Sequence, residues 1–142
     1  MNRHILYLLS FVVIIGCNPF DSDRVMNYEP ELTEITEFMK EYGDVVLDPD
    51  EDDRFAADMR SMGINYIVKN VTKNKNFSGF IEESDSLIIF IKKGQNFFQS
   101  ERRIIYDFAN NPRNFGNDKI SNASYEIVQL NTRWYFSTTG FD

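Results

Sequence analysis

The spacing of the apolar residues changes at Gly63, and this change leaves few fold classes open. Before Gly63 the apolar residues recur three or four positions apart, which is typical of one face of an α-helix. After Gly63 they alternate with polar residues, which is typical of half-buried β-strands. We therefore expect an α+β fold in which two helices are followed by about five or six antiparallel strands.

The helical half contains two amphipathic segments. The apolar residues of the first are Leu32, Ile35, Phe38, Met39 and Tyr42. This segment begins at Glu31, and Gly43 follows it as a candidate C-cap. Residues 48–50 (Asp-Pro-Asp) predict the start of the second helix, with the acids of residues 50–53 near the positive end of its dipole. Phe55, Met59 and Met62 would line one face of that helix, and Val45–Leu47 would be a short apolar link.

Among the strands, Ser86–Lys92 has the clearest pattern. The alternation of Ile64, Tyr66 and Val68 predicts an earlier strand, and residues 77–82 predict a short second one. Phe97–Phe108 contains the polar stretch Gln99–Arg103, so either a bulge or a change of sheet edge is expected there. Residues 109–122 are expected to form a loop, and Tyr125–Leu130 and Arg133–Thr138 a hairpin with Trp134 and Phe136 on one face. The helices should cover one face of a curved sheet, an arrangement similar to cystatin-like folds, which implies no function.

The first sixteen residues have the pattern of a secretory signal peptide. Asn2-Arg3-His4 is a short basic start, and Ile5–Ile15 is an eleven-residue apolar run. The run is too short to span a bilayer, which takes about 20 apolar residues.

Ile14-Ile15-Gly16-Cys17 resembles the lipobox of bacterial lipoproteins. The resemblance implies that Cys17 is lipidated, becomes the first mature residue and anchors the protein to a membrane of the bacterial cell envelope. Several acyl chains together make a stable anchor. Residues 1–16 would then be the signal peptide, residues 17–30 a lipidated cysteine with a polar tether, and residues 31–142 a single α+β domain.

Composition excludes several kinds of chemistry. His4 is the only histidine and Cys17 the only cysteine, so the processed domain would contain no histidine and no unmodified thiol. Ser–His and Cys–His catalysis, disulfides and zinc sites built from histidine or thiolate are therefore excluded. Without residues 1–16, which contain Arg3 and no acid, 14 basic residues face 22 acidic ones, a formal net charge of −8. Nucleic-acid binding needs clustered Lys and Arg and is not expected.

The negative charge is concentrated in the helical half. Between Glu29 and Asp58 the chain has twelve acidic residues and two basic ones, Lys40 and Arg54. The acidic residues of the stretch 48–53 resemble the ligands of a calcium-binding loop. An EF-hand loop that starts at Asp48 would, however, require Gly at its sixth position, which is Asp53, and Glu at its twelfth, which is Met59. We expect no metal and no cofactor.

Two further motifs allow two interpretations each. Gln99–Arg103 is either a recognition strip or a sheet edge protected by its charges. Trp134–Phe136 is either a platform for a sugar or peptide or part of the core, and alternation favours the core.

These observations favour a non-catalytic, membrane-anchored envelope lipoprotein that acts through protein–protein interaction, in an accessory or immunity-type role. Its partner surface would be the acidic group Asp50, Glu51, Asp52 and Asp53, facing a basic protein. The alternative is a small-ligand-binding lipoprotein with a pocket on the sheet. A carboxylate-dependent hydrolase is the third class. Its candidate acids are Glu82, Glu83, Asp85, Glu101, Asp107 and Glu126.

Overall fold

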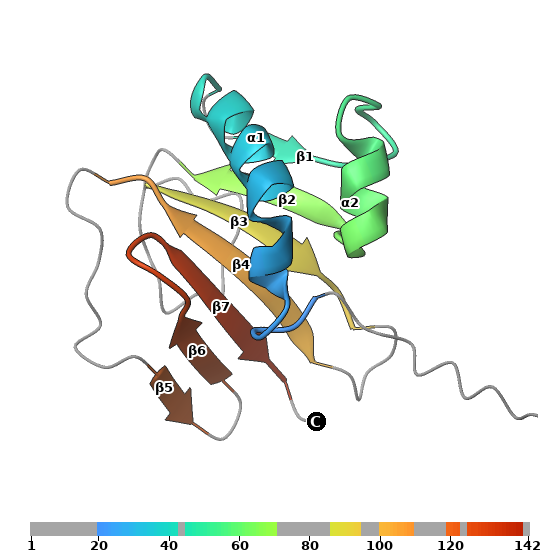
Figure 1. Cartoon of the computed structure of the whole chain (residues 1–142). Coiled ribbons are helices and arrows are strands. Elements are labelled where there is room, and N and C mark those ends of the chain that lie inside the picture. Colours follow the sequence, from blue (N-terminus) through green and yellow to red (C-terminus); the bar gives the residue numbers. More distant parts are fainter. Residues whose placement is uncertain are drawn as a thin grey trace, which may run out of the picture.

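The computed structural model describes residues 20–42, 45–70, 86–94, 100–109, 119–122 and 125–140. It confirms the α+β class (Figure 1). The helical elements are the 3₁₀-helix η1 (Val25–Tyr28) and the α-helices α1 (Glu29–Lys40) and α2 (Ala56–Met62). The strands are β1 (Val45–Leu47), β2 (Tyr66–Asn70), β3 (Leu87–Lys92), β4 (Glu101–Asp107), β5 (Lys119–Asn122), β6 (Tyr125–Gln129) and β7 (Trp134–Thr139).

The described strands form one antiparallel sheet of seven strands in the order β1-β2-β3-β4-β7-β6-β5. Strand β4 lies in the middle of this order, and β1 and β5 lie at its two ends. Both helices lie on the same face of the sheet, with α2 beside β1 and β2 (Figure 1). We call this the helix face and the opposite side the second face.

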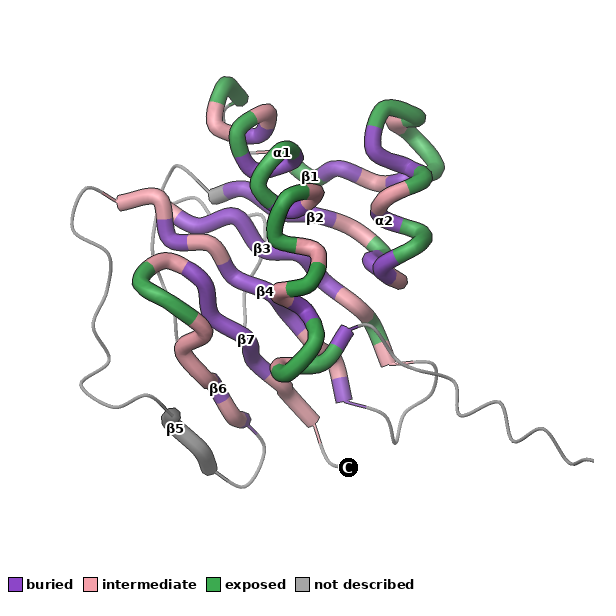
Figure 2. The backbone as a smooth tube through the Cα atoms, in the orientation of Figure 1, coloured by how far each residue is buried: buried purple, intermediate pink, exposed green. Residues whose placement is uncertain are grey.

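The core is built on both faces of the sheet because successive side chains of a strand point to opposite sides. In β3, Ile88 and Phe90 pack toward the helices, while Leu87, Ile89 and Ile91 pack on the second face. All five are at most 1% exposed, which explains the continuous apolar sequence of this strand. Figure 2 shows this buried stretch in purple along β3.

The hairpin of β6 and β7 confirms the predicted alternation. Trp134 and Phe136 belong to the core of the helix face, and Tyr135 belongs to the second face. The ring of Trp134 lies 4.8 Å from that of Tyr106 and 6.0 Å from that of Phe90, measured between centroids. The aromatic run is therefore core, and the platform interpretation is not needed for Trp134 or Phe136.

Lys69 on β2 fixes the end of α1 to the sheet. The residue is 2% exposed. Its ammonium group donates hydrogen bonds to the carbonyl oxygens of Met39 at 2.8 Å and Lys40 at 2.7 Å, and to that of Tyr42. These carbonyls belong to the C-terminal turn of α1, where the helix dipole favours positive charge. A buried cation thus replaces water as the cap of α1.

Gly63 ends α2 as predicted. It adopts a left-handed φ of 72°, which favours glycine. The next residue, Ile64, donates its backbone N–H to the carbonyl of Met59 at 2.8 Å. Phe55, Met59 and Met62 are buried on one face, also as predicted.

Three predictions for the helical half are wrong. Val45–Leu47 is not a link but strand β1, which pairs with β2. Helix α2 begins at Ala56 and not in the acidic run, whose residues form turns before it. Residues 20–30 are not a flexible tether, because Phe20 and Val25 are each 1% exposed in the core and α1 begins at Glu29.

Two predictions for the strand half also need correction. The polar residues Glu101, Arg102 and Arg103 do not interrupt the strand, since all three pair without a break with β7, and Arg102 and Arg103 also pair with β3. Residues 119–122 are not loop but strand β5, which pairs with β6. Cys17 and residues 1–16, the Gly43 cap and the strand predicted at residues 77–82 lie outside the described residues.

Candidate interaction and ligand sites

Residues 48–53, which we call the acidic turn, connect β1 to α2. The carboxylate of Asp48 accepts the backbone N–H of Asp50 at 2.8 Å, and the carboxylate of Asp52 accepts that of Arg54 at 2.9 Å. The Asp48 carbonyl accepts the N–H groups of Glu51 and Asp52, both at 3.0 Å. Aspartates at turns commonly bond the backbone two residues on in this way. The turn geometry therefore explains Asp48 and Asp52, which the sequence assigned to a helix start.

The four acids of the predicted partner surface are neighbours in the acidic turn. Asp50, Glu51 and Asp53 are exposed, and Asp52 is half-buried. The side chain of Asp50 is 84% exposed and lies 3.2 Å from the guanidinium of Arg60. Such exposed ion pairs contribute little to stability. The turn thus concentrates negative charge on the surface, and little of that charge is needed to hold the fold.

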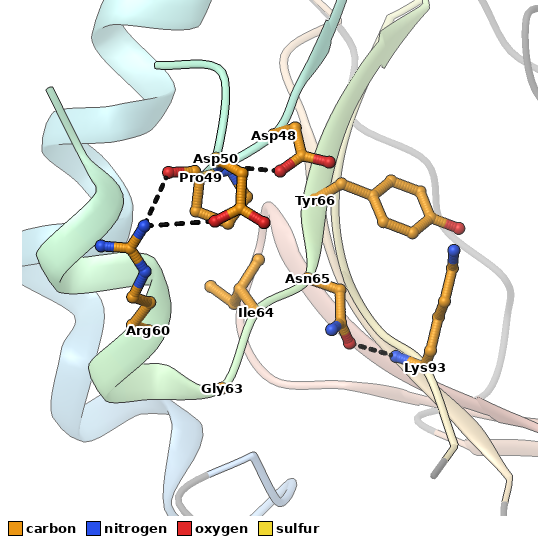
Figure 3. Close-up of a pocket in the computed structure, with 9 residues that line it drawn as sticks. All are labelled: Asp48, Pro49, Asp50, Arg60, Gly63, Ile64, Asn65, Tyr66 and Lys93. Atoms are coloured by element: carbon orange, nitrogen blue, oxygen red, sulfur yellow. Dashed lines mark hydrogen bonds and ion pairs between the residues drawn. The ribbon is translucent and has the colours of Figure 1, made fainter. Parts of the chain in front are cut away.

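A pocket of about 440 Å³ lies between the acidic turn, the end of α2 and the start of β2 (Figure 3). It is lined by Asp48, Pro49, Asp50, Arg60, Gly63, Ile64, Asn65, Tyr66 and Lys93. The Arg60 guanidinium donates to the Pro49 carbonyl at 3.0 Å, and the Asn65 side-chain oxygen accepts the Lys93 N–H at 2.8 Å. The first bond joins α2 to the acidic turn, and the second joins the start of β2 to the end of β3, so much of the polar lining of the pocket already serves the fold.

The outer edge of β1 is a more open surface. Strand β1 is the first in the sheet order, and no described strand pairs with its outer side. Val46 on this strand is 46% exposed, and so is Tyr42 at the end of α1. The Tyr42 ring lies 4.8 Å from that of Phe38, and the Arg54 guanidinium lies 4.2 Å from the Phe38 centroid. Val46 pairs with Val68 and so points to the second face, whereas Phe38, Tyr42 and Arg54 lie on the helix side of this edge. We call these four residues, which flank the edge of β1 on its two sides, the edge patch.

The edge patch adjoins the acidic turn. Residue Leu47 ends β1, and Asp48 begins the turn directly after it. Tyr42 and Val46 are the large apolar side chains that are exposed among the described residues. An apolar strand edge next to a cluster of carboxylates is thus the most prominent surface feature of the helical half.

The strip Gln99–Arg103 is not at a sheet edge, so the interpretation as a protected edge is wrong. Strand β4 lies between β3 and β7, and Arg103 is 5% exposed on the second face. The Arg103 guanidinium donates through Nε to the Glu101 carboxylate at 2.5 Å. Gln99 lies outside the described residues.

Polar side chains gather around this ion pair on the second face. Thr139 pairs with both Glu101 and Tyr125, and Ser137 pairs with Arg103. Residues directly opposite on one face have Cβ atoms about 5 Å apart. We call Glu101, Arg103, Tyr125, Ser137 and Thr139 the polar cluster.

Three hydroxyl groups of the polar cluster are buried without a hydrogen bond from any described residue: those of Tyr125, Ser137 and Thr139. Ser137 is 0% exposed and Tyr125 is 8% exposed. Leaving a buried polar group unsatisfied costs about 1–3 kcal/mol. Most buried polar groups in folded proteins are satisfied, so three neighbours of this kind call for an explanation.

Tyr66 borders the same end of the second face. Burial, and to a smaller extent the nearby Glu101 carboxylate, raise the pKa of its phenol above the usual 10.0, while Arg103 opposes the rise. The phenol therefore stays neutral at physiological pH and presents a hydroxyl and an aromatic ring.

The polar cluster was not predicted from the sequence, although the order of residues in β7 contains an indication of it. In β7, the residues of the helix face are Trp134, Phe136 and Thr138, and those of the second face are Tyr135, Ser137 and Thr139. Two hydroxyl residues at alternate positions after an aromatic core are unusual for a buried face. Without the register against β4 and β6, however, their neighbours could not be known.

The acids considered for hydrolysis do not form a catalytic pair among the described residues. Glu101 bonds to Arg103, and Asp107 accepts the Ala109 N–H at 2.9 Å in the bend after β4. Glu126 lies two strands away from β4, on β6. Residues 82, 83 and 85 lie outside the described part of the chain.

Comparison with known proteins finds no match for this chain among protein-family models, curated proteins or solved structures. Within the described ranges, no helix has the length and apolar character needed to cross a membrane. The acidic side chains of the described residues form no group of three that would hold a metal ion. Arguments about function therefore rest on the geometry of the edge patch, the acidic turn and the pocket beside it.

Proposed function

We propose that this protein is a non-catalytic, membrane-anchored lipoprotein of the bacterial cell envelope that binds a basic protein partner, in an accessory or immunity-type role. The observation that carries this proposal is the open edge of β1, with the exposed Tyr42 and Val46, directly beside the acidic turn.

The edge patch supports a protein as the partner. An unpaired strand edge presents backbone N–H and C=O groups that can pair with an extended segment of another chain. Natural proteins usually protect such edges with charged or proline residues, but β1 is Val45-Val46-Leu47. Tyr42 and Phe38 add an aromatic surface next to this edge, and aromatic residues are enriched at protein interfaces.

The acidic turn supports a basic partner. Asp50, Glu51, Asp52 and Asp53 follow the edge strand, and the stretch from Glu29 to Asp58 has twelve acidic residues against two basic ones. Concentrated charge of one sign steers an oppositely charged protein and speeds association, and salt weakens the effect. Apolar contact at the edge patch and charge at the turn would thus act on the same segment of the partner.

The proposed anchor is compatible with this surface. Cys17 precedes the buried Phe20 by three residues, a distance of at most about 10 Å in an extended chain. The folded domain would therefore lie close to the membrane. Helix α1 begins near this point and ends at Lys40, beside the edge patch, and its twelve residues span about 18 Å. The edge patch would face away from the membrane.

The test is site-specific photo-crosslinking in native membranes. A photoreactive phenylalanine analogue replaces Tyr42 or Val46, and the control position is Thr132, which is exposed in the turn between β6 and β7. We expect one basic protein to be captured from positions 42 and 46 and not from 132. A partner captured equally from all three positions, or none from 42 and 46, would contradict the proposed surface.

The charge contribution is tested by Asp50→Asn, Glu51→Gln, Asp52→Asn and Asp53→Asn together. Asparagine at position 52 keeps the oxygen that accepts the Arg54 N–H. The matched control is Asp21→Asn with Asp23→Asn, exposed acids at the other end of α1. Capture by the fourfold variant should fall and lose its salt dependence, while the control should behave as the wild type. The anchor is tested separately by Cys17→Ser, which should release the protein from membranes.

A further inference from the structure

The pocket between the acidic turn, α2 and β2 has a negative end with one carboxylate oxygen to spare. The Arg60 guanidinium bonds to the Pro49 carbonyl and pairs with Asp50 at 3.2 Å, so these groups are engaged with one another. Asp48 accepts the N–H of Asp50 through one oxygen of its carboxylate. Among the described residues, no donor bonds to the other oxygen of Asp48, which leaves a charged acceptor in the lining of the pocket.

Asn65 and Lys93 form the opposite, donating end of the pocket. The Asn65 side-chain oxygen accepts the Lys93 N–H at 2.8 Å, and this bond fixes the orientation of the amide, so that its Nδ2 group remains as a donor. The Lys93 ammonium lies 4.7 Å from the centroid of the Tyr66 ring and forms no ion pair within the described ranges. A cation over a tyrosine ring at an exposed position is held only weakly, so this ammonium can bond to a ligand.

The lining of the pocket is neutral as a whole, but its charges of opposite sign are separated. Asp48 and Asp50 lie in the upper part of Figure 3, and Asn65 and Lys93 lie in the lower part. A ligand with only a positive charge would meet the repulsion of Lys93 and Arg60, and one with only a negative charge would meet that of Asp48 and Asp50. A ligand that carries one charge of each sign avoids both.

The two charges that remain for a ligand lie beside the same aromatic ring. Asp48 directly follows Leu47, which pairs with Ile67, and Figure 3 shows its carboxylate next to Tyr66. The Lys93 ammonium lies over the ring of Tyr66. The ammonium and the carboxylate of the ligand must therefore be close to one another, as they are when both are attached to the same carbon atom.

The size and the walls of the pocket fit such a small molecule. Its volume of about 440 Å³ is in the usual range of ligand sites, which is about 300–1,000 Å³. Ile64, which is 3% exposed, and the buried Pro49 provide an apolar wall, and Tyr66 adds its aromatic ring. Asn65 and Lys93 are exposed, so a ligand can enter from the solvent.

We propose that this pocket binds a small zwitterion of the α-amino acid class. The ammonium group of the ligand bonds to the Asp48 carboxylate, and its carboxylate bonds to the Lys93 ammonium and the Asn65 amide. Its side chain packs against Ile64 and Pro49. The site depends neither on lipidation nor on a protein partner, because its polar residues belong neither to the edge patch nor to the four acids at residues 50–53.

The test compares three probes by calorimetry on the full chain. L-leucine carries both charges, L-leucinamide lacks the carboxylate, and N-acetyl-L-leucine lacks the ammonium group. We expect L-leucine to bind and each of the other two probes to bind at least about tenfold more weakly, which corresponds to about 1.4 kcal/mol.

The variants Asp48→Asn and Lys93→Met each remove one charge of the site. Asparagine keeps an oxygen that can accept the N–H of residue 50, so the turn is preserved. The matched controls are Asp21→Asn, since Asp21 also accepts a backbone N–H two residues on at 3.1 Å, and Lys40→Met, since Lys40 also lies over a tyrosine ring, that of Tyr106, at 5.2 Å. Each pocket variant should lose about tenfold in affinity for L-leucine, and the controls should bind as the wild type.

Three results would overturn the proposal. In the first, L-leucine does not bind the wild type. In the second, one of the probes with a single charge binds as tightly as L-leucine, which would make the pocket a site for that charge alone. In the third, Asp48→Asn and Lys93→Met bind L-leucine as tightly as their controls, which would place the ligand elsewhere. Thermal unfolding of each variant without probe confirms that a loss of binding is not a loss of folding.

Discussion

The two faces of the sheet differ in how their buried polar groups are bonded, although the helix face also has a buried hydroxyl, that of Thr36, to which no described residue bonds. On the helix face, Lys69 is buried and bonds to the carbonyl oxygens that end α1. On the second face, the hydroxyls of Ser137, Thr139 and Tyr125 are buried next to one another and bond to no described residue. A buried group that holds the fold is expected in any stable domain, whereas buried hydroxyls without a protein partner are commonly bonded to ordered water.

A single strand shows the contrast most directly. Every second residue of β7 faces the helices, and there Trp134 and Phe136 pack against aromatic neighbours. The residues between them face the other way and change from Tyr135 to Ser137 and Thr139. The two faces are therefore under different constraints along the same backbone. On the helix face of β7 the apolar packing extends to Phe136 and is followed by Thr138, whereas the second face is already polar from Ser137.

The largest expected effect tests the packing of the helix face. Phe90→Ala removes a fully buried ring that lies 6.0 Å from the Trp134 ring, and should lower the free energy of unfolding by about 3–5 kcal/mol. Urea unfolding followed by circular dichroism measures the loss. Val46→Ala, on the exposed edge of β1, is the control and should change stability by less than about 0.5 kcal/mol. An equal loss in both variants would show that the helix face is not the main core.

The second prediction tests the buried cation. Lys69→Met keeps much of the side-chain volume but leaves the carbonyl groups of Met39, Lys40 and Tyr42 without their donor. We expect a loss of about 2–3 kcal/mol in the free energy of unfolding. Lys93→Met, at an exposed position, serves as the control. If the two variants were equally stable, Lys69 would not be a cap of α1, and the contrast between the faces would fail.

The sequence predicts those parts of the fold that depend on residues close together in the chain, and it fails for those that depend on contacts between distant residues. The helical spacing of Leu32, Ile35 and Met39, the left-handed Gly63 and the apolar run of β3 are local signals, and the structure confirms them. Phe20 was predicted to lie in the polar tether because its neighbours in sequence are polar. Its ring instead packs 6.1 Å, between centroids, from that of Phe136, a residue far away in the sequence that no local pattern indicates.

The same reasoning explains the errors at the candidate sites. Strand β1 has only three residues, and it is defined by its pairing with β2, which no local pattern shows. Glu101–Arg103 reads as a polar interruption, yet the Glu101–Arg103 ion pair allows it to lie in the middle strand. The polar cluster depends on the register of three strands, so its residue types could be read from the sequence but their proximity could not.

The third prediction tests the second face without any ligand. Thr139→Val removes a buried hydroxyl but keeps the branched shape of the side chain, so the domain should become more stable by up to about 1 kcal/mol. Thr36→Val, on the helix face, should show an effect of the same sign because its hydroxyl is equally unsatisfied. Urea unfolding curves give both changes in the free energy of unfolding, provided that the dependence of this free energy on urea concentration is the same in each variant. A clear destabilisation by Thr139→Val alone would mean that its hydroxyl is needed by the fold, which would remove the contrast.

The smallest expected effect concerns Tyr66 and appears only at alkaline pH. Burial first, and then the Glu101 carboxylate, raise the pKa of its phenol above 10.0 in the folded protein. Above about pH 10 the unfolded chain ionises Tyr66 while the folded state still holds the proton, so the stability contributed by this group falls as pH rises through that range. Below about pH 10 the contribution is fully present. Tyr66→Phe cannot ionise, so the stability difference between wild type and variant should be constant from about pH 7 to about pH 9 and then decrease.

Urea unfolding over this pH series measures the difference, and Tyr42→Phe, at an exposed position, is the control. A flat difference for Tyr66→Phe across the whole series would show that the end of the second face next to Glu101 is open to water and does not bury the polar cluster.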